Sequence, residues 1–179
     1  TFFYTHPVGL AVNLSVSGGA MWPPVFRDDR RDELNPITTE QVVHALRQPG
    51  IVLGMHPEGT RGRHSDPYEF LPTRPGIGRL LKAVDPETVV LPFFILGMGS
   101  ELRKELGIML RRPPGQEIRL RFSRPLTAGE LQAMDLDDQA LADHIMELVA
   151  IEARADRAER VAQGRWPADS SQTAEPAGP

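Results

Sequence analysis

The stretch IVLGMHPEGTRGR, Ile51 to Arg63, decides the expected fold. It opens with apolar residues as far as Met55, broken only by Gly54, and then changes to a histidine, a glutamate, a threonine and two arginines. A short apolar run of this kind predicts a buried strand, and the polar residues behind it predict a turn. In α/β sheets, ligands bind at the carboxyl ends of strands. The stretch therefore predicts a functional turn on an α/β fold.

Helices and strands are expected to alternate along the rest of the chain. Apolar spacing and capping residues predict helices at 38–48, 76–84, 100–106 and 141–152, and a capping box at Thr127. Residues 89–96 are continuously apolar, which predicts a strand buried on both faces. The pattern predicts an α/β fold in one domain, with a central, mostly buried sheet flanked by helices.

A further strand is expected in EIRLRFSRP, residues 117–125. Its apolar residues alternate with Arg119 and Arg121, so one face should be buried and the other should face water. The sequence predicts a half-exposed strand whose basic row points outward.

The predicted domain covers residues 1–152 and is expected to be incomplete at its N-terminus. Residues 153–179 lose the apolar stripe and become charged, then rich in Ala, Pro and Ser, which predicts a disordered tail from about Gly164. Net charge is +3 over residues 1–125 and −7 over 126–179, so the two parts are expected to face different partners.

Composition excludes several classes of function. Cysteine is absent, which rules out disulfides, thiolate metal sites and thiol nucleophiles. No apolar run approaches the roughly 18 to 20 residues of a membrane span, and none of the printed residues is expected to form a signal peptide. A cytoplasmic protein without a nucleic-acid partner is expected. Eighteen of the 20 basic residues are arginine, which fits either anion recognition or the codon bias of a GC-rich bacterial genome.

The residues of the turn are suited to a phosphate group. Gly59 permits close backbone approach, Thr60 offers a hydroxyl donor, and Arg61 offers a charged fork that binds phosphate with two hydrogen bonds. Glu58 would repel phosphate unless it pairs with an arginine or accepts a hydrogen bond from a substrate hydroxyl. The turn predicts a phosphate that is attached to an alcohol.

Each of these residues also has a structural interpretation. A Gly-Thr-Arg turn beside a glutamate can be a salt-bridged surface turn, and His56 can be a hydrogen-bonded structural histidine. The run FRDDRRDE, residues 26–33, can be a solvated charge cluster, or it can recognise phosphate through Arg27 or Arg30. His64 and Asp66 have no third ligand close in sequence, so no metal site is expected.

Three blocks in order resemble the glycerolipid acyltransferases, the family of glycerol-3-phosphate and 1-acylglycerol-3-phosphate acyltransferases. HPEGTRGR (56–63) resembles that family's Glu-Gly-Thr-Arg block, FLPTRPGIGRLLKAV (70–84) its Phe-Lys-x-Gly stretch, and VVLPFFILG (89–97) its later strand with a central proline. Upstream, PPVFRDDRR (23–31) is similar to the family's arginine block, with Arg27 in the arginine position and Pro24 where an aromatic residue is usual.

The resemblance implies transfer of a fatty acyl group, in phospholipid biosynthesis, to a hydroxyl of a glycerol-phosphate or lysophospholipid acceptor. The donor would be acyl-CoA or acyl carrier protein as co-substrate, with no cofactor and no metal, and the protein would lie peripherally at the inner face of the membrane. Arg27, Gly59, Thr60 and Arg61 would bind the acceptor phosphate, and Glu58 would order the turn. A non-catalytic phospholipid-binding or scaffold domain is the alternative.

The chain departs from the family in its first block, His-x4-Asp, which supplies the general base. No carboxylate precedes Asp28, and the residue five positions after His6 is Ala11. The catalytic base is therefore unknown, with His56 as a weak candidate, and the family's own block is expected upstream of Thr1. A chain without a base should bind acceptor and acylate it poorly.

Overall fold

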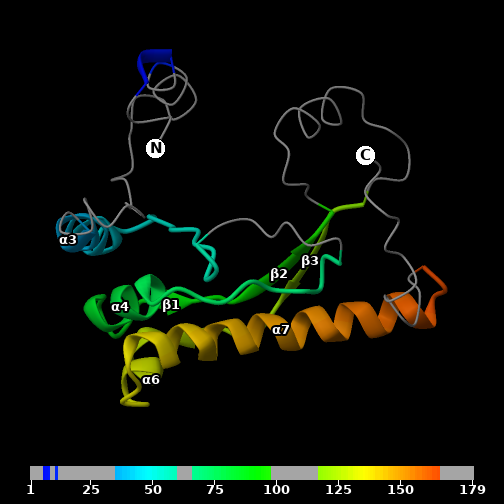
Figure 1. Ribbon diagram of the computed structural model, residues 1–179. Helices are drawn as coiled ribbons and strands as arrows, with labels where there is room; N and C mark the ends of the chain where they lie inside the picture. Colours follow the sequence, from blue (N-terminus) through cyan, green and yellow to red (C-terminus); the bar gives the residue numbers. More distant parts are fainter. Residues whose placement is uncertain (1–5, 9–10, 12–34, 60–65, 98–116, 166–179) are drawn as a thin grey trace. The chain divides into compact units, whose positions relative to one another are not determined.

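The computed structural model describes residues 6–8, 11, 35–59, 66–97 and 117–165. The chain divides into two compact units, one of residues 1–53 and 83–85 and one of residues 54–82 and 86–179. In chain order (Figure 1), the elements are α3 (Asn35–Leu46), α4 (Gly76–Ala83), β1 (Val89–Val90), β2 (Phe93–Leu96), β3 (Arg119–Phe122), β4 (Leu126–Thr127), α6 (Ala128–Gln132) and α7 (Asp138–Ala162).

The strands of the second unit pair in two short antiparallel sheets, β1 with β4 and β2 with β3. Val90 lies opposite Leu126, and Phe93 lies opposite Phe122. Between these two pairs, the two residues 91–92 therefore face the three residues 123–125. An extra residue on one strand makes a bulge. Pro92 and Pro125 both lie in this bulge, where neither has an N–H to donate to a hydrogen bond between the strands. The described part is thus a mixed helix and strand structure, consistent with the α/β class, but its sheets are short and antiparallel.

Two predicted strands are wrong in detail. The continuous strand expected at 89–96 is broken at residues 91 and 92, and it is not buried on both faces, because Val89 is 68% and Phe93 is 41% exposed. The strand expected at Ile51–Met55 is not formed, and Val52 is 85% exposed. An apolar run identifies a strand only if a neighbour pairs with it, and no described residue pairs with 51–55.

Strand β3 forms where it is predicted, but its faces are reversed. The side chains of Arg119 and Arg121 are only 16% and 32% exposed, whereas Leu120 and Phe122 are 47% and 55% exposed. The arginines lie on the side of α7, where acidic residues pair with them. The outer face is apolar, with the rings of Phe93 and Phe122 in contact at 5.7 Å between centroids.

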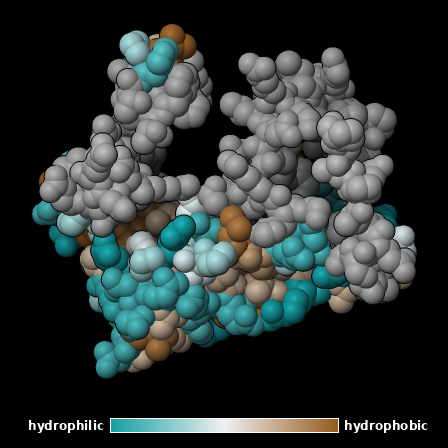
Figure 2. All heavy atoms as spheres, viewed as in Figure 1, coloured by the Kyte–Doolittle hydropathy of each residue, from teal (hydrophilic) through white to brown (hydrophobic). Residues whose placement is uncertain are grey.

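Helix α7 packs on β2 and β3 and organises the core of this unit (Figure 1). One cluster joins α7 to α4, β4 and α6, and a second joins α7 to β2. The first cluster contains Leu81, Leu126, Leu131, Leu141 and Ile145, and the second contains Phe94, Leu96, Met146, Val149 and Ala153. Figure 2 shows mostly hydrophilic residues over α7 on the face that it draws, as expected for a helix with one buried stripe.

The helices agree with the sequence predictions better than the strands do. Thr127 accepts a hydrogen bond from the Glu130 backbone, and the Glu130 carboxylate accepts one from the Thr127 N–H, which confirms the predicted capping box. This bond from the Thr127 backbone lowers the pKa of Glu130. Helix α4 is confirmed, and α3 begins at Asn35, three residues before the predicted cap at Thr38. The helix predicted at 100–106 lies outside the described residues.

Helix α7 continues past the end predicted for it at residue 152. It reaches Ala162, and both Ala153 and Asp156 are buried. The predicted domain boundary therefore falls inside a helix. The polar stretch keeps its helical packing because its buried side chains include a charged one, which a search for apolar spacing does not find. The part of the tail at 166–179 lies outside the described residues.

Candidate functional site

The turn that follows the 51–55 segment is a hydrogen-bonded reverse turn. The Gly59 N–H donates to the His56 carbonyl at 2.8 Å, with Pro57 at the second position. Gly59 has φ +67°, a left-handed conformation that glycine adopts without strain. His56 is exposed at the start of the turn. Residues 56–59 therefore form a turn, as the sequence predicts.

Glu58 links the turn to a segment further along the chain. Its Oε1 accepts a hydrogen bond at 2.5 Å from the backbone N–H of Leu71, thirteen residues along the chain. A carboxylate that accepts a backbone N–H gains a strong, charge-assisted hydrogen bond. Glu58 thus orders the turn by tying it to the segment at residue 71.

Arg74 is brought to the turn by the same segment, and sequence reasoning missed it. Its backbone N–H donates to the Pro57 carbonyl at 2.8 Å. A Cβ placed on Gly59 would lie 3.3 Å from Cγ of Arg74, so the arginine side chain runs directly beside the glycine. Arg74 is exposed, and the aliphatic part of its side chain lies beside the turn. The available signal was the arginine within FLPTRPG, in the second block of the family resemblance.

The remaining predicted binding residues are not placed by the structure. Arg27, Thr60 and Arg61 lie outside the described residues, as does the competing Arg30. Of the predicted set, the structure brings together Glu58 and Gly59, with His56 on the same turn. The candidate site in the described part therefore consists of the turn 56–59 and Arg74.

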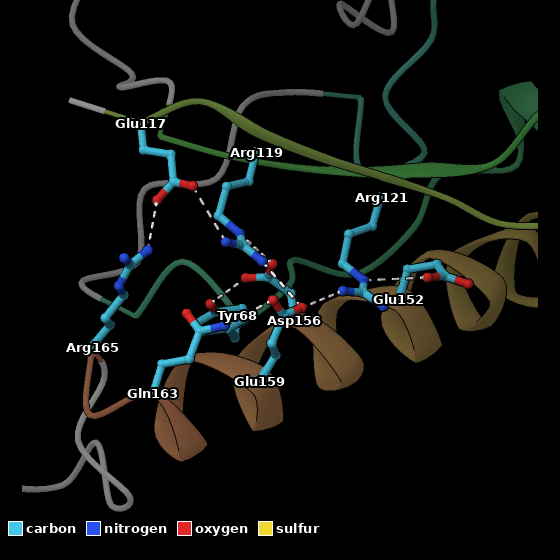
Figure 3. Close-up of polar contacts among 9 residues, drawn as sticks. All are labelled: Tyr68, Glu117, Arg119, Arg121, Glu152, Asp156, Glu159, Gln163 and Arg165. Atoms are coloured by element: carbon cyan, nitrogen blue, oxygen red, sulfur yellow. Dashed lines mark hydrogen bonds and ion pairs between the residues drawn. The ribbon is translucent and has the colours of Figure 1, made fainter. Parts of the chain in front are cut away.

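A second charged cluster lies where β3 packs on α7 (Figure 3). Asp156 is completely buried, and its two oxygens accept from the Tyr68 hydroxyl at 2.7 Å and from Nε of Arg119 at 2.8 Å. Arg119 also pairs with Glu159 at 3.2 Å, and Arg121 pairs with Glu159 at 2.8 Å. The basic row of β3 and the acidic row of α7 therefore neutralise one another.

Protonation in this cluster is biased towards a stable ion network. Burial, followed by the hydrogen bond to Asp156, raises the pKa of Tyr68 and keeps its hydroxyl a donor. The hydrogen bond from Arg119 lowers the pKa of Glu159, and the bond to Asp156 raises the pKa of Arg119. Tyr68 therefore stays neutral, and Arg119 and Glu159 stay charged, through the neutral range, so the cluster is suited to fixing α7 on β3 rather than to moving protons.

The asymmetry of charge along the sequence is explained by this contact. The acidic part was expected to face a different partner from the basic part. Asp156 and Glu159 instead pair within the chain with Arg119 and Arg121. Both guanidinium groups already form ion pairs within the chain, which leaves Arg74 as the better candidate for an added anion.

The described residues hold no group of three or more side chains that could bind a metal ion, and none of their helices combines the length and apolarity that a bilayer crossing requires.

Comparisons with protein-family models, with curated proteins and with solved structures found no match for this chain.

Proposed function

We propose that this chain is an acyltransferase-type domain that binds a glycerol-phosphate-type acceptor through its phosphate at the turn beginning at His56. The observation that carries the proposal is the placement of Arg74 beside Gly59. A glycine permits close approach of an anion to the backbone, and an exposed guanidinium can bind phosphate with two hydrogen bonds. Thr60 and Arg61, next in sequence, would complete the donor set.

The role of Glu58 supports this reading. An uncommitted carboxylate in a phosphate site would weaken binding by repulsion. The hydrogen bond from Leu71 gives Glu58 a partner within the protein, so it contributes order to the turn. This backbone partner is neither the arginine nor the substrate hydroxyl that the sequence suggested for Glu58, but it fits the turn-ordering role that the family resemblance implied.

Acyl transfer at such a site needs a thioester donor, which we propose is acyl-CoA or acyl carrier protein. The acceptor hydroxyl oxygen forms a bond to the thioester carbonyl carbon, and the carbon–sulfur bond breaks. The hydroxyl proton passes to a general base and then to the departing thiolate. His56 is the ionisable imidazole on the turn, but no described contact orients it as a catalytic base. We propose binding of acceptor without efficient transfer by these residues, at the cytoplasmic face of a membrane.

The test measures transfer from acyl-CoA to lysophosphatidic acid with and without added imidazole. The chain alone should stay at background. Added imidazole can replace a missing general base. If the protein holds the acceptor and the thioester together, imidazole should raise the transfer rate about tenfold, which is less than the usual rate gain from a built-in general base.

Arg74→Ala should remove the imidazole-dependent transfer, and Arg124→Ala, a change to an arginine that is 71% exposed, should retain it. A chain that binds glycerol 3-phosphate but gains nothing from imidazole would be the non-catalytic binding domain. Transfer without imidazole that His56→Ala abolishes would identify His56 as the base.

A further inference from the structure

The segment Leu71–Arg74, called the strap here, is held on one side by the candidate turn. The Leu71 N–H donates to Glu58, and the Arg74 N–H donates to the Pro57 carbonyl. These bonds fix the backbone on both sides of Thr73. They do not by themselves hold the strap against the rest of the fold.

The other side of the strap is held by α7. The Thr73 hydroxyl donates a hydrogen bond to Oδ1 of Asp143. The Gln139 side-chain amide donates to the Thr73 hydroxyl and, at 2.9 Å, to the same Asp143 oxygen. The hydrogen bond from Thr73, followed by that from Gln139, lowers the pKa of Asp143. The carboxylate therefore stays ionised and accepts both bonds. Thr73, one residue from Arg74, is therefore clamped by two residues one helical turn apart.

Helix α4 follows the strap, and its backbone packs closely against the backbone at the start of α7. A Cβ on Gly78 would lie 1.9 Å from the carbonyl oxygen of Asp138, so only glycine fits there. Arg79 and Lys82 flank this contact and pair with the Asp138 carboxylate at 3.6 and 3.0 Å. The first two turns of α7 thus meet the strap and α4 at residues 138, 139 and 143.

We propose that α7 positions Arg74 over the turn through Asp143, which makes Asp143 a positioning residue for the phosphate site. This inference rests on the proposed function. Asp143 itself would not touch the ligand. Its hydrogen bond to Thr73 limits the conformations of the strap, so that the Arg74 side chain is already beside Gly59 when the anion arrives.

The sign of the effect separates positioning from simple electrostatics. Removing an acidic group near an anion site should strengthen anion binding if charge alone matters. The positioning account gives the opposite sign when the hydrogen-bond acceptor is lost with the charge. Asp143→Asn removes the charge and keeps an acceptor oxygen, whereas Asp143→Leu removes both.

The experiment titrates sn-glycerol 3-phosphate into the full chain by calorimetry. Asp143→Leu should weaken binding about fivefold, which is the value of one ordinary hydrogen bond, and Asp143→Asn should stay within about twofold of the wild type. Glu147→Leu is the matched control, since Glu147 lies one turn further along α7, is 59% exposed and pairs with Arg154. Amide hydrogen exchange of Arg74 should be faster in Asp143→Leu than in Asp143→Asn.

A double variant completes the test. With Arg74→Ala already present, Asp143→Leu should cause no further loss of affinity, because it acts through Arg74. Equal or tighter binding by Asp143→Leu, with unchanged exchange at Arg74, would overturn this inference alone. Absence of binding by the wild-type chain would overturn the proposed function and this inference with it.

Discussion

Asp156→Ala is expected to lower the free energy of unfolding by about 3 to 5 kcal/mol, the cost of removing one partner from a buried ion pair. Asp156 is completely buried and accepts from Tyr68 and Arg119. Its removal leaves a phenol hydroxyl and a guanidinium, itself only 16% exposed, without their main acceptor. Urea denaturation followed by circular dichroism measures the change.

Glu147→Ala is the control for Asp156→Ala, because both remove an acidic side chain from α7. Glu147 is 59% exposed and pairs with an arginine that is 61% exposed, so its loss should cost less than about 1 kcal/mol. Equal, small effects of the two changes would show that the buried network does not fix α7 on β3.

Gly78→Ala is expected to destabilise the protein by about 3 kcal/mol, at the upper end of the usual cost of overpacking. The new methyl group would overlap the Asp138 carbonyl, because its carbon would lie 1.9 Å from that oxygen. A backbone atom cannot rotate away as a side chain can. Helix α4 would have to separate from α7, at the cost of the contacts of Leu81 in the core.

Gly76→Ala provides the comparison within the same helix. A Cβ at Gly76 meets nothing within 4 Å, so this change should leave stability unchanged or raise it by up to about 1 kcal/mol through helix propensity. Thermal unfolding of both variants measures the difference. Similar melting temperatures for the two would contradict the close contact between α4 and α7.

Features set by neighbouring residues could be predicted from the sequence. The capping box of Thr127 and Glu130 depends on residues three apart, and it was confirmed. Helix α4 was likewise confirmed, because its apolar spacing and the residues at its ends are local. A pattern of this kind contains its own partners, so tertiary structure need not be known.

Features set by distant residues could not be predicted in the same way. The alternation in β3 located the strand, but the apolar face was assigned inward by default. Asp156 and Glu159, more than thirty residues away, reverse that assignment by pairing with the arginines. The segment 51–55 was wrong for a related reason, since its composition says nothing about whether a second strand lies beside it.

The candidate site likewise combines features set by neighbouring residues with features set by distant ones. The reverse turn that ends at Gly59 is set by neighbouring residues, whereas the ordering role of Glu58 depends on Leu71, thirteen residues along the chain. The contact of Arg74 with Gly59 depends on the path of the chain between them, so the sequence could not reveal it.

The most direct test of phosphate binding at this turn is a calorimetric titration of the 179-residue chain with sn-glycerol 3-phosphate and, separately, with glycerol. Only the phosphorylated ligand should bind. Arg61→Ala and Arg74→Ala should each weaken binding about tenfold or more, the value of a charged hydrogen bond, and Arg124→Ala should leave it unchanged. Equal affinity in all the arginine variants, or equal binding of glycerol, would contradict a phosphate site at this turn.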